Sequence, residues 1–372
     1  MLFPVGVMVL LTSVITQSRI YPYTHNKWLF VALGALLAVP LYFFTGRAAA
    51  LCGEGGLYGG LERRLGRIPS GAFALVFMFS ALLTGAGLLR IFCQLIQIVT
   101  LPETPLFLIA APLVCAALAL IYKGATVLGR WAHFSLPIVI IVLLLGYLLS
   151  TKNLEPQNLL PVMYGEWQNL VPYTLLSLLN PFSLLTLLLV PYCACADRER
   201  SSRSLLLTLL LGGGLFLLSV LMNIMILGDG KALSTYFTTY SAFSFINVSS
   251  VFQRMESLII LLLLVCCICF LGICLHIFTN SLFYLTRNKF RKPSFLLSGV
   301  AMAALSILLK ESTMSLFSTQ LSNHIYLVLT QVALPVSIFC IFKWKKARKS
   351  SRTSGRESVV SSHHGVDGQQ KQ

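Results

Sequence analysis

The chain has 372 residues, of which 56% are hydrophobic and only 11% are charged, whereas a soluble globular domain carries about 25% charged residues. Its formal net charge of +16 would suit a nucleic-acid partner, but the Lys and Arg residues lie between apolar runs and near the C-terminal end, with no basic stripe interleaved with aromatic residues. These features exclude a soluble domain and a nucleic-acid-binding protein. They predict an all-α protein whose main surroundings are the lipid bilayer.

Apolar stretches of roughly 20 residues, the length that crosses a hydrocarbon core of about 30 Å, recur along the sequence. The first stretch lacks a positively charged start and a small-residue cleavage site, so we interpret it as a span rather than a signal peptide. The pattern predicts one polytopic domain over residues 1–343, with about ten transmembrane helices near 2–17, 28–45, 72–92, 105–122, 132–150, 171–191, 204–227, 256–285, 294–309 and 323–342.

Basic residues divide unevenly between the two sides of these spans. With a cytoplasmic N-terminus, one side receives 13 Lys and Arg residues before the tail and the other receives 7. The positive-inside rule therefore places both termini in the cytoplasm. Residues 53–70 combine Leu57, Leu61 and Leu65 at helical spacing with arginines, which predicts a short interfacial helix on the inner leaflet. Residues 344–372 are basic and poor in apolar residues, which predicts a disordered tail.

The ten cysteines lie mostly within or beside apolar runs, where they act as small packing residues. A metal site at Cys266, Cys267 and Cys269 would place thiolates in hydrocarbon without a matched His or carboxylate, so we expect no metal and no cofactor. His276 lies deep in a span, where it either relays protons or is neutral and hydrogen-bonded to a neighbouring helix. No catalytic motif has supporting context, and we expect the protein not to be an enzyme.

Ten spans divide into two sets of five, and because five is odd, the second set enters the membrane from the opposite side. This arrangement permits an inverted repeat, and interrupted helices at matched positions would then mark a midplane site. The first helices of the two sets contain Pro4 and Gly6, and Asn180 and Pro181, respectively. A proline removes an amide donor and frees a carbonyl one turn earlier. The alternative is a tolerated proline kink with no ligand nearby.

Several short segments then indicate a family. They are the stretch Leu10 to Thr12 followed by a polar loop and Trp28, the sequence GGLERRLG at 59–66, Arg90, Thr104 and Pro105, Asn158 to Pro161 with Gly165, and FQRMESL at 252–258. In their order along nearly all ten spans, they resemble the B subunit of endospore nutrient germinant receptors. That group is the spore permease branch of the amino acid, polyamine and organocation (APC) transporter superfamily.

The resemblance implies a LeuT-like fold with a 5+5 inverted repeat, located in the spore inner membrane or the cell membrane. It implies a nutrient ligand, such as an amino acid, and two partner proteins, a germinant receptor A subunit and a lipoprotein C subunit. By position, the ligand-binding residues would be Gly6, Val7, Val9, Thr12, Asn180, Pro181, Phe182, Ser183, Cys266, Cys269 and Phe270. One departure is that Val7, Met8 and Val9 stand where the family has small, glycine-rich residues, so either recognition has drifted or the true start lies upstream.

Three hypotheses follow for the function. The first is a germinant-sensing subunit that binds a nutrient without turnover and signals through partner subunits. The second is a secondary active transporter for an amino acid or amine. The third is a scaffold that has lost ligand binding and acts as an assembly partner, a reading motivated by the missing glycines.

Overall fold

A computed structural model describes residues 2–16, 26–52, 55–160, 162, 167–194, 201–244, 255–287, 291–309 and 328–343. The predicted tail at 344–372 lies outside these residues, as do residue 17 and residues 323–327 of the predicted spans. The regular elements of the described part are all helical, and no strand occurs among them. The prediction of an all-α protein is therefore confirmed.

The helices fall into long and short elements. The long α-helices are α3 (Lys27–Leu51), α5 (Arg67–Val99), α7 (Ala125–Leu149), α11 (Gly214–Ser234) and α13 (Met255–Leu285). The shorter α-helices are α1 (Leu2–Thr12), α4 (Gly56–Leu65), α6 (Leu106–Tyr122), α8 (Leu170–Leu179), α9 (Leu189–Cys193), α10 (Ser201–Thr208), α12 (Thr238–Ser244) and α14 (Arg291–Leu308).

Segments of other helical geometry connect or extend these α-helices. The 3-10 helices are η1 (Ser13–Thr16), η2 (Ser150–Asn153), η3 (Pro156–Leu159), η4 (Trp167–Asn169) and η5 (Phe182–Leu188). The π-helices are η7 (Leu209–Gly213), between α10 and α11, and η8 (Val328–Ala333), which continues as α-helix to residue 343.

Six helical segments of the described chain are long and apolar enough to cross a membrane: Lys27–Leu51, Arg67–Val99, Ala125–Asn153, Trp167–Cys193, Ser202–Gly228 and Glu256–Leu285. Shorter apolar segments are Leu2–Ile15, Leu106–Tyr122, Pro293–Leu308 and Val328–Lys343. Each predicted span overlaps one of these segments. The protein is a multi-pass membrane protein, while the inverted repeat of two five-helix sets stays a prediction.

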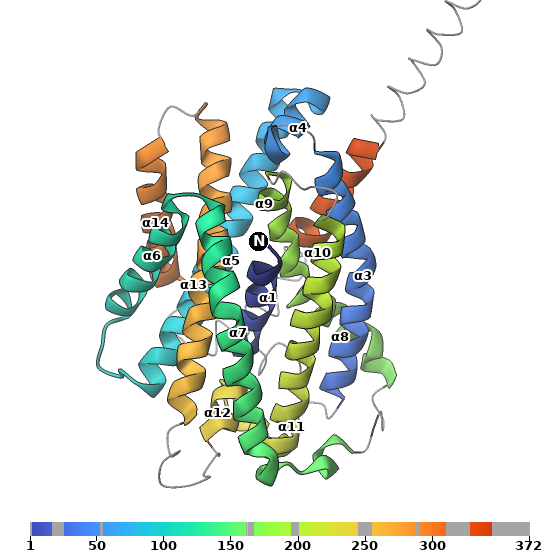
Figure 1. Cartoon of the computed structure of the whole chain (residues 1–372), viewed down its shortest axis with the longest axis vertical. Coiled ribbons are helices and arrows are strands. Elements are labelled where there is room, and N and C mark those ends of the chain that lie inside the picture. The colour runs from blue at the N-terminus through green and yellow to red at the C-terminus, as the bar shows by residue number, and fades with distance from the viewer. Residues whose placement is uncertain are drawn as a thin grey trace, which may run out of the picture.

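Helix α1 lies in the middle of the bundle (Figure 1) and contacts α7, α10, α13 and η5. Its residues from Pro4 to Thr12 are all buried. A helix that is apolar and buried on every side needs protein around it, and the surrounding helices supply it. Among the other helices of the bundle, the most extensive contact joins α5 to α13, and α3 packs on α8 and α10.

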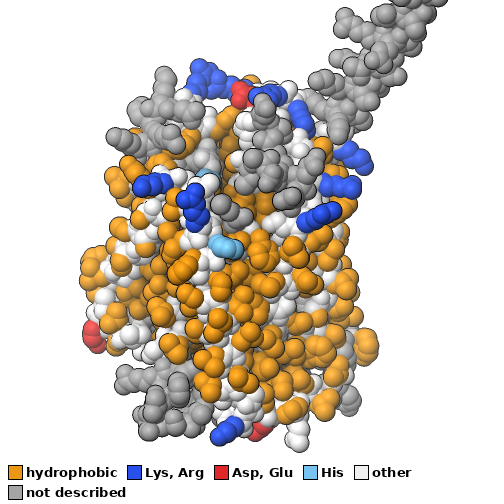
Figure 2. All heavy atoms as spheres, viewed as in Figure 1, with side chains coloured by type: hydrophobic (Ala, Val, Ile, Leu, Met, Phe, Trp, Pro, Cys, Tyr) orange, Lys and Arg blue, Asp and Glu red, His pale blue; other side chains and the backbone are white. Residues whose placement is uncertain are grey.

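The outward faces of the bundle helices carry large hydrophobic side chains, and Figure 2 shows them as a broad band around the middle of the molecule. Examples from four helices, with exposed fractions of 64% to 76%, are Leu36, Phe134, Ile141, Leu210 and Leu296. A contiguous apolar surface of this extent would be insoluble in water, whereas it matches the hydrocarbon of a bilayer. Lys and Arg side chains gather instead at the end that carries α4 (Figure 2).

Helix α4 is the short helix expected from the spacing of Leu57 and Leu61, both of which are buried. Tyr58 joins it to the inner bundle: its hydroxyl lies 2.6 Å from Ser281 Oγ, and its ring stacks on Tyr284 with centroids 5.3 Å apart. Burial raises the pKa of Tyr58 above its ordinary value, so the hydroxyl keeps its proton. The placement of α4 on the inner leaflet stays a prediction.

Candidate functional site

The most irregular buried backbone of the bundle lies between α8 and η5. Helix α8 ends at Leu179, Asn180 is extended with φ −147° and ψ 111°, and a 3-10 helix begins after Pro181. Pro181 cannot donate a backbone hydrogen bond, and it disfavours helical geometry at the residue before it. The predicted interruption at Asn180 and Pro181 is therefore present in the structure, and both residues are buried.

Side chains from three parts of the chain hold this interruption. Tyr42 of α3 donates a hydrogen bond to the carbonyl oxygen of Phe182. Ser183 Oγ contacts the carbonyl oxygen of Leu179 and also Oε1 of Gln331 in η8. Tyr42, Ser183 and Gln331 are each fully buried. Asn180, Pro181, Phe182 and Ser183 thus form one group around the interruption, which we call the helix break.

Sequence reasoning missed Tyr42 and Gln331. Both are polar residues inside predicted apolar spans, 28–45 and 323–342, and a polar group in hydrocarbon requires a partner or a function. That signal was present in the sequence. What it did not contain was the pairing, because Tyr42 and Phe182 are 140 positions apart, and Ser183 and Gln331 are 148 apart.

Helix α1 differs from its predicted irregular form. It is a regular α-helix across Gly6, Val7 and Val9, and the geometry changes to a 3-10 helix only at Ser13. Pro4 does not interrupt it, because a proline in the first turn removes a donor that has no helical partner. The expectation of an interruption near Pro4 and Gly6 is wrong for the described residues. Thr12 Oγ1 donates to the carbonyl of Val9 at 2.6 Å.

Gly6 serves close packing rather than an open backbone. A Cβ atom at this position would lie 2.6 Å from Cγ2 of Thr208 and 3.1 Å from Cδ1 of Leu188. A side chain there would require the side chains of Thr208 in α10 or Leu188 in η5 to move. The glycine therefore allows α1 to pass between these two segments, beside the helix break.

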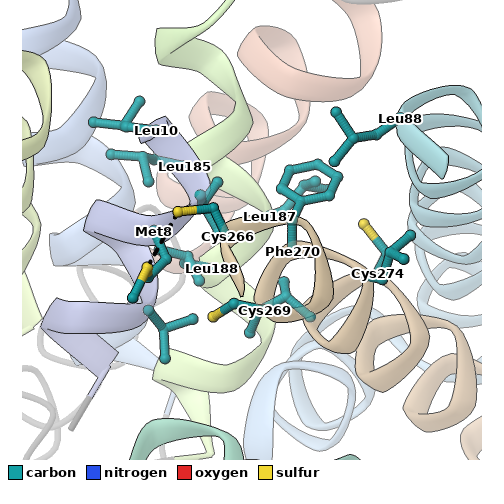
Figure 3. Close-up of a cluster of buried hydrophobic side chains, with 14 of the residues drawn as sticks. Met8, Leu10, Leu88, Leu185, Leu187, Leu188, Cys266, Cys269, Phe270 and Cys274 are labelled. Atoms are coloured by element: carbon teal, nitrogen blue, oxygen red, sulfur yellow. Dashed lines mark hydrogen bonds between the residues drawn. The ribbon is translucent and has the colours of Figure 1, made fainter. Parts of the chain in front are cut away.

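A second group of predicted residues lies where α1, η5 and α13 meet. Cys266 Sγ is 3.5 Å from Met8 Sδ, and Cys269 and Phe270 lie close by on α13 (Figure 3). Leu185, Leu187 and Leu188 of η5 complete this apolar cluster, and the labelled residues other than Leu88 are at most 2% exposed. We call it the sulfur cluster. Met8 was absent from the predicted set, although it lies between two predicted residues.

Two predicted residues face a different neighbour. The Cα atom of Val7 lies 3.3 Å from the position that a Cβ of Gly212 would occupy, so α1 packs closely against the π-helix η7 at this point. The ring of Phe182 packs edge-on against Phe216 of α11, with centroids 6.2 Å apart. The predicted set therefore separates into the helix break, the sulfur cluster and contacts with η7 and α11.

The chemistry that these groups offer is hydrogen bonding and apolar contact. Within the described residues, no group of three or more His, Cys, Asp or Glu is placed to hold a metal ion. His276 lies 2.9 Å from Asn280 Nδ2, one turn further along its own helix. When Asn280 donates this hydrogen bond, Nε2 of His276 accepts it and carries no proton.

Comparison with known proteins decides the family. A family model described as "Spore germination protein" matches residues 1–314. The chain belongs to this family. The resemblance found in the sequence is confirmed, and with it the association of this membrane protein with spore germination.

Two relatives from Bacillus subtilis (strain 168) are similar to this spore germination family member. The putative spore germination protein YfkT is 26% identical over 238 residues, which are 63% of this chain and 64% of that protein. Spore germination protein KB is 21% identical over 345 residues, which are 90% of this chain and 91% of that protein. The chain thus matches most of protein KB but less than two thirds of YfkT.

Proposed function

We propose that this chain is the transmembrane subunit of a spore nutrient germinant receptor. It binds an amino acid or a similar small nutrient near the membrane midplane and does not convert it chemically. The helix break is the binding site, and the sulfur cluster supports it from the side of α1 and α13. Family membership and the similarity to spore germination protein KB support the role in germination.

The observation that carries the proposal is the interruption at Asn180 and Pro181 in the interior of an apolar bundle. Irregular backbone at membrane depth is costly unless it is buried in protein or lines a cavity for solvent or ligand. Helix ends also present partial charges that favour the polar groups of small solutes. A short polar segment between two helical ends is thus suited to hold a small polar nutrient.

Signalling follows when the ligand binds one arrangement of the break more tightly than another. A ligand shifts such an equilibrium only by its difference in affinity for the two arrangements. The break contacts α3 through Tyr42 and η8 through Gln331, so a rearrangement there would be transmitted to α3 and to the helix that continues η8. We propose that the germinant receptor A subunit and the lipoprotein C subunit receive this change.

The orientation proposed for the subunit has both termini in the cytoplasm. Lys and Arg side chains gather at the end that carries α4 (Figure 2), and exposed cations flanking spans favour the cytoplasmic side. This end would face the cytoplasm of the spore or cell, in the spore inner membrane or the cell membrane.

A secondary active transporter for an amino acid or amine is the second candidate. The interrupted helix favours it as well, because transporters of this architecture bind their substrates at such segments. The two functions differ in outcome: a receptor binds and signals, whereas a transporter accumulates its substrate under an ion gradient.

The experiment that separates them is deletion of the gene in its host. Spore germination is scored against single nutrients, and uptake of the same nutrients is measured in vegetative cells. We expect loss of the response to one nutrient with normal uptake, restored by the gene in trans. Normal germination together with impaired uptake would overturn the receptor function and favour the transporter.

A further inference from the structure

Gln331 of η8 lies beside the helix break and has unused hydrogen-bonding capacity. Its side chain is fully buried, and its Oε1 atom contacts Ser183 Oγ. Its Nε2 atom has no hydrogen-bond partner within the described part of the chain. Gln331 lies in the π-helix η8, a geometry that is rare and often found at functional sites.

Burial of the unpaired Nε2 atom of Gln331 costs free energy. A buried N–H donor without an acceptor keeps the full penalty of leaving water, and folded proteins pair the large majority of such groups. The Oε1 atom is held beside the Ser183 hydroxyl, whose single proton is shared between this oxygen and the carbonyl oxygen of Leu179. Nε2 is then the end of the carboxamide that remains for another molecule.

The side chains that hold the break have no charge of their own. Tyr42, Ser183 and Gln331 bear hydroxyl and carboxamide groups, and the Tyr42 hydroxyl is already directed to the carbonyl of Phe182. Leu179 and Leu185, which flank the break on either side, are buried aliphatic residues. These residues would therefore recognise a ligand through hydrogen bonds and apolar contacts.

We propose that Gln331 determines ligand specificity by donating a hydrogen bond from Nε2 to an acceptor oxygen of the ligand, a carboxylate or a carbonyl. This inference rests on the proposed function, since it assumes that the helix break is the binding site. It selects molecules that present an acceptor oxygen beside a small aliphatic group. An amine without such an oxygen leaves the amide nitrogen unpaired and binds poorly.

The chain offers a matched control for this assignment. Gln94 is a second buried glutamine, 5% exposed, on α5. Its Oε1 atom has no hydrogen-bond partner among the described residues, and the hydrogen bonds that hold the helix break come from Tyr42 and Gln331 instead. The same substitution at Gln94 therefore reports the general effect of placing a carboxyl group in this bundle.

The experiment measures binding of three probes to the purified full-length chain in lipid nanodiscs. The probes are L-valine, 3-methylbutanoate, which lacks the amino group, and isobutylamine, which lacks the carboxylate. We expect the first two to bind saturably and the amine not to bind. Gln331→Glu should weaken L-valine binding by about tenfold or more, the loss expected for one hydrogen bond to a charged group. Gln94→Glu should retain the wild-type affinity.

A second variant keeps the test valid if Gln331→Glu does not fold. Gln331→Met has nearly the same volume, removes the donor and adds no charge, so it should also weaken L-valine binding. Unchanged L-valine affinity in Gln331→Met or Gln331→Glu would overturn the role of Gln331 while the proposed function stands. Isobutylamine that binds the wild-type chain as tightly as L-valine would also overturn the proposal. Isobutylamine binding gained in Gln331→Glu would support it, because this variant places a carboxylate oxygen where Nε2 lies. A wild-type chain that binds none of the probes would overturn the specificity assigned to Gln331, whereas the proposed function is tested separately by deletion of the gene.

Discussion

The phenolic hydroxyl of Tyr42, on α3, donates a hydrogen bond to the backbone carbonyl of Phe182, the first residue after Pro181. Both residues are fully buried. The Phe182 carbonyl stands at the start of the 3-10 helix η5, and in a region without bulk water its additional hydrogen-bond donor comes from a side chain of another helix. The interrupted segment is therefore tied to α3, the helix that also packs along α8 and α10.

The first prediction concerns this hydrogen bond. Tyr42→Phe removes this hydrogen bond, and we expect a loss of about 0.5–1.5 kcal/mol in stability together with weaker ligand binding. Thermal unfolding in detergent and nutrient binding measure the two effects. Tyr147→Phe is the matched control, because Tyr147 is a buried tyrosine whose hydroxyl lies 2.6 Å from Ser219 Oγ. Loss of the Tyr147 hydroxyl should lower stability without changing ligand binding. Equal binding defects in both variants would contradict the role of Tyr42.

The second prediction concerns the proline of the break. Pro181→Ala removes the steric restriction on Asn180 and restores a backbone donor, so the segment gains access to continuous helix. We expect normal membrane insertion but weaker nutrient binding, measured by expression level and titration. Pro137→Ala, within the continuous helix α7, should leave binding unchanged. An unaltered affinity in the Pro181 variant would mean that the break is not part of the site.

The third prediction concerns the packing of α3 against α8. A Cβ atom at Gly34 would lie 2.5 Å from Cβ of Ser177 and 3.1 Å from the backbone nitrogen of Leu178. Gly34→Ala should therefore force the two helices apart and cost about 1–3 kcal/mol, as overpacking of a dense interior does. Gly87→Ala is the control, because no atom lies within 4 Å of its added Cβ. If thermal unfolding shows both variants to be equally stable, the close approach of α3 and α8 is not required.

The fourth prediction concerns Arg64. Its Nη2 atom donates to the carbonyl of Leu51 at 2.6 Å, and its guanidinium carbon lies 4.1 Å from the ring centroid of Phe342. One side chain thus joins the end of α3, helix α4 and the C-terminal helix. We expect Arg64→Met to increase amide hydrogen exchange across residues 56–65, because these contacts contribute about 1–2 kcal/mol. The exposed neighbour Arg63 provides the control, and Arg63→Met exchanging as fast as Arg64→Met would contradict the assignment.

Local chemistry decided which features were predictable from the sequence. The interruption at Asn180 and Pro181 follows from properties of proline that act within a few residues, so sequence reasoning located it. The amphipathic spacing of Leu57 and Leu61 likewise predicted α4. By contrast, the hydrogen bond from Tyr42 and the contact between Ser183 and Gln331 join segments far apart in the chain, and only packing brings them together.

Helix α1 shows the opposite case, in which a local signal indicated the wrong structure. Gly6 beside Pro4 suggested an open backbone, yet the glycine accommodates Thr208 and Leu188 at close range. A missing Cβ permits both an irregular backbone and a close approach of neighbours, and the sequence does not distinguish them. The cysteines were interpreted as packing residues and also as candidates for the pocket. The contact between Cys266 and Met8 places this cysteine against α1. The apolar character of the two segments did not predict which of their residues would meet.

The uncharged side chains of the helix break have an electrical consequence. Moving one elementary charge through a membrane potential of about 100 mV changes the free energy by about 2.3 kcal/mol. Tyr42, Ser183 and Gln331 carry no such charge, so a rearrangement of these side chains performs no electrical work of its own. For the proposed receptor, these side chains therefore add no dependence on membrane potential, and they leave the equilibrium between two forms of the break to the ligand and to packing.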